Sequence, residues 1–194
     1  MNLRVDLVQI AQWVEPRSRV LDLGCGDGAL LAHLRRDKSC TGYGVDIDDD
    51  HVARCVKAGI NVIQQNLDAG LRMFADNMFD TVILSQTLQA MHNAQGILRE
   101  MARVARQGIV SFPNFGHWRH AIALLAGHMP VTRQIPYQWY DTPNIHLCTL
   151  KDFEILAARV GLVITGRAVL ADGRPVHVAP ALRATVAVYR FEAR

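Results

Sequence analysis

The stretch Val20-Leu21-Asp22-Leu23-Gly24-Cys25-Gly26-Asp27-Gly28 decides the fold of this chain. Its apolar lead-in, interrupted by one acid, is typical of a parallel strand that is covered on both faces. The three glycines at alternate positions permit positive φ angles and let the backbone approach a ligand closely. Leu30, Leu31 and Leu34 then follow at helical spacing. A strand, a glycine loop and a helix in this order predict a nucleotide-type site at the carboxyl end of the strand.

The charges of the loop indicate which ligand it holds. A helix N-terminus attracts a pyrophosphate, but carboxylates at Asp22 and Asp27 would repel one. The same carboxylates favour a cationic ligand such as S-adenosylmethionine (SAM), which carries a sulfonium and an amino group. Asp46 lies 22 residues after Gly24, close to the ~20-residue offset of a ribose-binding acid. We therefore predict a SAM-type pocket. Two alternatives stay open: a nicotinamide or flavin site with Ala29 as the third small residue of the motif, and a structural turn in which Asp22 caps the helix.

Composition excludes several classes of protein. The 194 residues suit one domain, 1–194, with a proper core. The net charge is +3 and the basic residues are scattered, so we expect no nucleic-acid partner. No apolar run approaches the ~18 residues of a membrane span, and residues 1–15 hold an acid and no small-residue cleavage site. The four cysteines show no CxxC pair, so we predict free thiols, no metal site and a cytoplasmic location.

Strands and helices alternate in the hydrophobic pattern. Strands are predicted at 19–23, 41–47, 60–64, 81–84, 109–112, 162–169 and 184–191. Helices are predicted at 5–14, 29–36, 48–58, 97–105, 118–126 and 149–161. The last two strands are joined by too short and proline-broken a segment for a crossover helix, so we expect them to be antiparallel. The prediction is an α/β fold: one doubly wound, Rossmann-like, mostly parallel seven-stranded sheet with one antiparallel strand. Residues 113–149 are predicted to form an insertion or lid.

The chain as a whole resembles a class I SAM-dependent methyltransferase fold. Three stretches resemble the methionine-biosynthesis MetW family more narrowly: Leu84-Ser85-Gln86-Thr87-Leu88-Gln89, Pro113-Asn114-Phe115-Gly116-His117-Trp118, and Met129-Pro130-Val131-Thr132 with Pro136-Tyr137-Gln138-Trp139-Tyr140-Asp141-Thr142-Pro143-Asn144-Ile145-His146-Leu147-Cys148-Thr149. The resemblance implies a protein that binds and activates or regulates homoserine O-acyltransferase (MetX), an acetyl- or succinyltransferase. Because SAM is a downstream product of methionine, a SAM pocket would suit a feedback sensor.

The same resemblance implies the cofactor contacts. Asp22 and the loop glycines would face the methionine part of SAM or of S-adenosylhomocysteine, Asp46 the ribose hydroxyls and Ile47 the adenine. Asn66 stands where such folds often carry an acid that contacts the adenine amino group. Asp68 either substitutes for that acid or caps the turn at 69–73, and the cap is slightly favoured. The predicted cofactor-binding set is Asp22, Gly24, Cys25, Gly26, Gly28, Asp46, Ile47, Asn66, Leu67, Asp68 and Ser85.

No catalytic residue is predicted. Amide and adenine methylases carry an Asn/Asp-Pro-Pro-aromatic run after the fourth strand, and this chain has Ser85-Gln86-Thr87-Leu88 instead. Four histidines could each serve as a base, but a single loop histidine is more often structural: His92, His117, His120 and His146. The alternative hypothesis is a SAM-dependent methyltransferase that acts on a small molecule, since the glycine loop and Asp46 are intact.

Aromatic residues gather in and beside the insertion. Trp118, Tyr137, Trp139 and Tyr140 could form a partner-binding surface, pack on the protein itself, or line an acceptor pocket. Tyr and Trp anchor many protein interfaces, so these four residues are the predicted partner-binding set.

Overall fold

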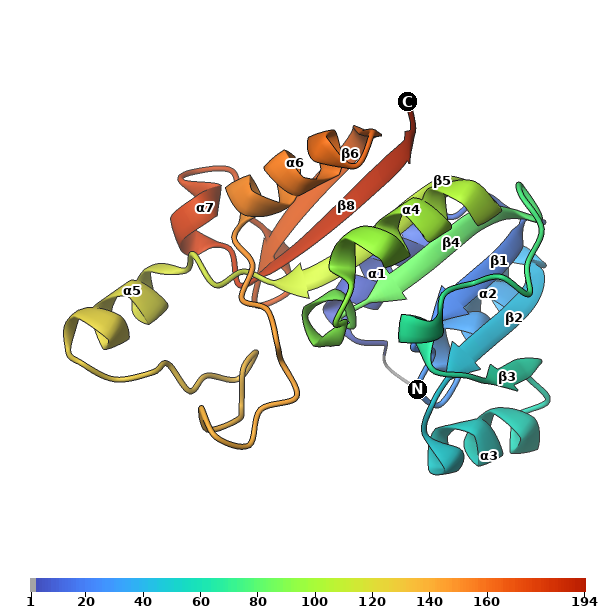
Figure 1. Cartoon of the computed structure of the whole chain (residues 1–194), viewed down its shortest axis with the longest axis horizontal. Coiled ribbons are helices and arrows are strands. Elements are labelled where there is room, and N and C mark those ends of the chain that lie inside the picture. The colour runs from blue at the N-terminus through green and yellow to red at the C-terminus, as the bar shows by residue number, and fades with distance from the viewer. Residues whose placement is uncertain (1–2) are drawn as a thin grey trace.

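The computed structural model of the chain describes residues 3–194 (Figure 1). Within them, eight strands form one sheet in the order β3-β2-β1-β4-β5-β8-β6-β7. The strands are β1 (Arg19–Leu23), β2 (Thr41–Asp46), β3 (Val62–Gln64), β4 (Phe79–Ser85), β5 (Ala105–Pro113), β6 (Leu162–Ala171), β7 (Arg174–Pro175) and β8 (Val186–Ala193). The helices are α1 (Val5–Trp13), α2 (Ala29–Lys38), α3 (Asp49–Lys57), α4 (Ala94–Val104), α5 (Trp118–Leu125), α6 (Leu150–Arg159) and α7 (Pro180–Arg183).

The predicted sheet is confirmed. Strands β1 to β5 are parallel to one another, and β8 runs antiparallel to both β5 and β6. The antiparallel pairing of the last two long strands was predicted from the short link between them. The eighth strand is β7, a two-residue segment that folds back on the end of β6.

Helices cover both faces of the sheet. Alternate side chains of a strand point to opposite faces, and here they enter two separate apolar clusters. On β1, Leu21 and Leu23 pack in the cluster that holds α4 and α6, whereas Val20 packs in the cluster that holds α1 and α2. Figure 1 shows α4 and α6 in front of the sheet and α1 and α2 behind it. Asp22 falls on the face of Val20, and so lies under α1 and α2.

The start of β5 corrects the sequence prediction. The pattern predicted that the fourth helix includes Ala105 and that Gln107 and Gly108 form a turn. Instead α4 ends at Val104, and β5 begins directly at Ala105, which pairs with Phe79. A Cβ on Gly108 would lie 2.2 Å from the ring of Phe191. This glycine therefore admits an aromatic ring of β8 rather than turning the chain.

Two predicted helix starts are confirmed by their capping bonds. Asp48 accepts a hydrogen bond from the His51 N–H at the start of α3, at 2.9 Å. Thr149 accepts one from the Asp152 N–H at the start of α6, at 3.3 Å. Each bond satisfies one of the free N–H groups of a helix's first turn.

The predicted insertion lies between β5 and α6. Residues 114–149 of it contain α5 and otherwise neither helix nor strand. It projects beyond the carboxyl end of β5 (Figure 1). Backbone bonds from Ile145 and His146 to the Gln89 carbonyl tie its return limb to the body, at 2.8 and 2.9 Å. Among residues 3–194, no helix has the length and apolar character needed to cross a membrane.

Candidate functional site

Strand register brings the predicted site together. Leu23, the last residue of β1, pairs with Val45 on one side and Leu84 on the other. The next residues of the three strands are therefore neighbours at the carboxyl edge of the sheet. A cleft of about 1000 Å³ opens there. The predicted cofactor residues that line it are Gly24, Gly26, Asp46, Ile47, Asn66, Leu67, Asp68 and Ser85.

Three predicted cofactor residues do not line this cleft. Asp22 is buried on β1, with 2% of its surface exposed. The Cys25 sulfur points inward and lies 3.9 Å from the Cys55 sulfur. Gly28 is the N-cap residue of α2, and a Cβ there would lie 3.0 Å from the same Cys55 sulfur. Cys25 and Gly28 therefore shape and support the loop instead of facing a ligand.

Two glycines leave the main chain of the loop exposed to the cleft. Gly24 has φ +70°, and a Cβ there would lie 2.5 Å from the Thr87 hydroxyl oxygen. Gly26 has φ +58°, and nothing lies within 4 Å of the place where its Cβ would be. The loop thus needs glycine for its conformation and leaves open space beside the main chain.

Asp46 is held at the base of the cleft by three donors. Its Oδ2 accepts from the Gly26 N–H at 2.8 Å, and its Oδ1 accepts from the Asp48 N–H at 3.0 Å. The His51 ring Nδ1 lies 3.2 Å from the same Oδ1. The acid that the sequence placed at the end of the second strand therefore touches the glycine loop directly.

The carboxyl of Asp22 is buried and only partly compensated. Its Oδ1 has no hydrogen-bond partner among residues 3–194. Burial raises the pKa of Asp22 to about 7, while Arg4 acts to lower it and Asp46 to raise it. The two acids thus make the floor of the loop electronegative, and a cation placed nearby would relieve their mutual repulsion. The structural alternative, in which Asp22 caps the helix, is wrong, because Asp27 makes the bond to the Ala29 N–H.

Sequence reasoning missed a buried ion pair beside the cleft. Asp6, at the start of α1, is 1% exposed and accepts from the Arg4 guanidinium at 2.7 and 3.0 Å. It also accepts from Ser111 at 2.8 Å, and Arg4 in turn donates to Ser85. Burial alone would raise the pKa of Asp6, but the hydrogen bonds and charge of Arg4 outweigh it and the pKa is lowered. One signal was available: Asp6 precedes Ile10 by four residues and so lies in the buried stripe of its helix.

The adenine end of the predicted site corrects one assignment. Asn66 caps the 3₁₀ turn Leu67–Ala69, because its side-chain oxygen accepts from the Asp68 N–H at 2.9 Å. Within residues 3–194, the Asp68 carboxylate makes no bond to the turn at 69–73 that it was predicted to cap. Asp68 instead accepts from the backbone N–H and ring of His92, at 3.0 and 2.8 Å. Asn66 immediately precedes this turn, and from that position an asparagine side chain can bond to the backbone N–H two residues later. One lone pair of the Asn66 oxygen is thus already used.

The structure places the four predicted partner-binding residues at three different locations. Trp139 and Tyr140 are each 71% exposed and touch in an edge-on pair, with ring centroids 5.6 Å apart. Tyr137 lines the cleft itself. Trp118 starts α5, on the other limb of the insertion.

Comparison with solved structures defines the class of the fold. The structure resembles a SAM-dependent methyltransferase from Archaeoglobus fulgidus with a TM-score of 0.72 and 15% identity, over 96% of this chain and 90% of that one. It resembles an S-adenosylmethionine-dependent methyltransferase from Mesorhizobium loti with a TM-score of 0.71 and 18% identity, over 96% of both chains. The fold is therefore that of the class I SAM methyltransferases.

A comparison with protein families identifies a family within this fold class. The profile described as "Methionine biosynthesis protein MetW" matches residues 4–191. The chain belongs to the MetW family of methionine biosynthesis. It is also 36% identical over 176 residues to the "Bifunctional methionine biosynthesis protein MetXA/MetW" of Rhodopirellula baltica, a match that covers 84% of this chain and 28% of that protein. The chain spans only about a third or less of the curated relatives that it matches.

The raised pKa of Asp22 predicts a pH dependence of stability. Its pKa in the folded protein, about 7, lies above the ordinary value of 3.8, so the folded protein keeps a proton that the unfolded chain loses. Its contribution to stability is therefore present near pH 4 and is lost as the pH rises to about 7. Asp22→Asn removes this loss, so the variant should gain stability relative to wild type by on the order of 2–4 kcal/mol between pH 4 and pH 8.

Urea unfolding at several pH values measures this difference. Asp50→Asn, at an exposed position on α3, is the matched control for the loss of one carboxylate. Parallel stability profiles for wild type and Asp22→Asn would show that the buried carboxyl does not titrate as described.

Proposed function

We propose that the cleft binds SAM or S-adenosylhomocysteine. The observation that supports this best is the acidic floor. Asp46 lines the cleft, and Asp22 lies buried beneath it with one carboxyl oxygen that has no hydrogen-bond partner among residues 3–194. Asp46 would accept from the ribose hydroxyls, Ile47 and Leu67 would contact the adenine, and the open side of Gly26 would receive the methionine part. When bound, SAM supplies an electrophilic methyl group on its sulfonium.

We propose further that the chain acts in methionine biosynthesis as a regulatory partner of MetX, the homoserine O-acyltransferase. Support comes from the Rhodopirellula baltica relative, whose name joins MetXA and MetW in a single polypeptide. Fusion gives two modules a high effective concentration for each other, which suits modules that work in contact. A cytoplasmic location is part of this proposal.

The ends of β4 and β5 support a role without methyl transfer. Ser85 and Ser111 are neighbours there in register, and both bond to Asp6 or its partner Arg4. Asp6 has a lowered pKa and is held by charge-assisted bonds, so it is a poor proton acceptor. The hydroxyl groups at the ends of β4 and β5 are therefore already hydrogen-bonded to the Arg4–Asp6 ion pair.

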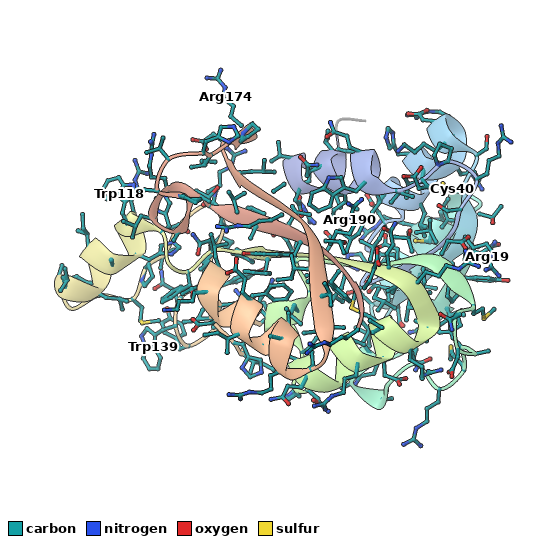
Figure 2. The ribbon with its side chains drawn as sticks, turned by 90° about the horizontal axis from the view of Figure 1, so that it is seen from above. Arg19, Cys40, Trp118, Trp139, Arg174 and Arg190 are labelled. Atoms are coloured by element: carbon teal, nitrogen blue, oxygen red, sulfur yellow. The ribbon has the colours of Figure 1, made fainter. Side chains whose placement is uncertain are left out.

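The insertion offers the surface for the partner. Figure 2 shows Trp118 and Trp139 at the same end of the molecule, opposite Cys40 and Arg19. Tyr137 lines the cleft and is two residues from the exposed Trp139, so the segment touches both the ligand space and the surface. A ligand that orders Tyr137 would thereby alter the surface that the acyltransferase meets, which is the physical basis for a feedback sensor.

A second candidate is a methyltransferase for a small molecule. A cavity of about 690 Å³ adjoins the cleft and shares four lining residues with it: Arg4, Gln86, Ala90 and Tyr137. Such a volume fits an acceptor of ordinary ligand size. Transfer of label from methyl-labelled SAM to a product in cell extract would favour this candidate over the regulatory role.

Loss of the Asp46 carboxylate should weaken SAM binding. Asp46→Ala is expected to cost about 1.5–3 kcal/mol of binding free energy, the value of hydrogen bonds to a charged group, while the protein stays folded. Asp50→Ala removes an exposed carboxylate four residues away and should leave the affinity unchanged. Isothermal calorimetry gives both values, and equal affinities of wild type and Asp46→Ala would place the ribose elsewhere.

Loss of an exposed indole should weaken the complex with the acyltransferase. Trp139→Ala is expected to cost about 2 kcal/mol or more of association free energy, as for a central aromatic anchor. Tyr43→Ala, at a 39% exposed aromatic on β2, is the matched control. Surface-bound acyltransferase and a series of chain concentrations give the dissociation constants. Unaltered binding by Trp139→Ala would show that the interface lies outside the insertion. If the wild-type chain neither binds the acyltransferase nor changes its rate, the regulatory proposal is wrong.

A further inference from the structure

A third cavity lies beside the insertion and shares four lining residues with the cavity of about 690 Å³: Arg133, Gln134, Asp172 and Thr185. It has a volume of about 620 Å³ and is bounded by α5, residues 129–134, the end of β6 and the end of α7. Among residues 3–194, the lining of this cavity and the lining of the SAM-type cleft have no residue in common. A ligand in this cavity would therefore contact other residues than a ligand in the cleft.

The charges around this cavity are strongly unbalanced. Three arginines line it, Arg119, Arg133 and Arg183, against the single carboxylate of Asp172. Within residues 3–194, none of the three guanidinium groups takes part in an ion pair. They come from three separate segments of the chain, so the fold, rather than one basic run, brings them together.

Two histidines lie in the same wall: His117 adds a donor, and His120 is held by bonds inside the protein. His117 accepts from the Arg119 N–H through Nδ1 at 3.3 Å, so its ring proton lies on Nε2. His120 is 3% exposed and is fixed between the Phe115 carbonyl at 3.1 Å and the Thr132 hydroxyl at 3.4 Å. The two imidazole centroids are 5.7 Å apart.

The direction of the pKa shift of His117 indicates that its surroundings are positive. Burial lowers the pKa of His117, and its neighbours His120 and Arg119 lower it further, while Asp172 acts in the opposite direction. A positive environment disfavours the protonated imidazole. The same environment favours an anion, and an anion would raise this pKa by supplying the missing negative charge.

From this arrangement of three unpaired guanidinium groups and two imidazoles around one cavity, we propose a binding site for a phosphate-bearing small molecule. Guanidinium forks bind phosphate oxygens in pairs, with charge-assisted hydrogen bonds. Trp118 and Met129 also line the cavity and offer an apolar wall to an organic group attached to the phosphate. The volume is in the range of ordinary ligand pockets.

The test uses the whole purified chain without its partner, in chloride buffer at constant ionic strength. Inorganic pyrophosphate is titrated by calorimetry into wild type, Arg183→Gln, Arg119→Gln and Arg159→Gln. Each cavity variant should bind at least about 10-fold more weakly, as expected for lost charged hydrogen bonds. Arg159→Gln, on the exposed side of α6, should match wild type. The substituted side chains are exposed, so circular dichroism should show all variants folded.

A second readout separates site binding from general charge attraction. Pyrophosphate should raise the pKa of His117, followed by NMR of its ring protons, in wild type but not in Arg183→Gln. Phenyl phosphate and inorganic phosphate then identify the source: tighter binding of phenyl phosphate indicates an organic phosphate, and equal binding indicates free phosphate. No binding of any of these anions to wild type, or binding that Arg183→Gln and Arg119→Gln leave unchanged, would overturn the proposal. Both results are independent of SAM binding and of the acyltransferase.

Discussion

The site depends on one electrostatic constraint: a carboxyl group buried under a glycine loop with too little positive charge around it. Asp22 cannot reach water and has one oxygen without a partner among residues 3–194. Strand pairing sets Asp46 at the neighbouring strand end, and it bonds to the loop itself. Removing a charge from water is costly unless a partner compensates it. The loop is therefore prepared for a ligand that brings positive charge, and a pyrophosphate would add to the repulsion.

The N-terminal segment completes the surroundings of the site in an unexpected way. Arg4 lines the cleft while its guanidinium holds Asp6 beneath the sheet edge. A buried pair of this kind is weak evidence for stability, because desolvation offsets the attraction. Its effect on chemistry is clearer: it occupies the polar groups at the ends of β4 and β5. The MetW chain thus keeps the glycine loop of the methyltransferase fold, while the ends of β4 and β5 join an internal network with Arg4 and Asp6.

Local patterns predicted most of the fold and much of the site. The β1 stretch, the position of Asp46 and the caps at Asp48 and Thr149 follow from spacing and hydrogen-bonding chemistry within a few residues. The Arg4–Asp6–Ser111 network joins residues about a hundred positions apart, which no local period reveals. Gly108 was predicted to form a turn because the ring of Phe191, which requires a glycine at this position, comes from the other end of the chain. Asn66 and Asp68 are both good caps, and only the backbone decided between them.

The central claim is that the acidic loop prefers a cationic nucleoside to a dinucleotide phosphate. Calorimetric titration of the purified chain with SAM and with NAD, at pH 8 where Asp22 is ionised, tests this claim most directly. We expect saturable binding of SAM and no binding of NAD at the same concentrations. Binding of NAD without binding of SAM would contradict it.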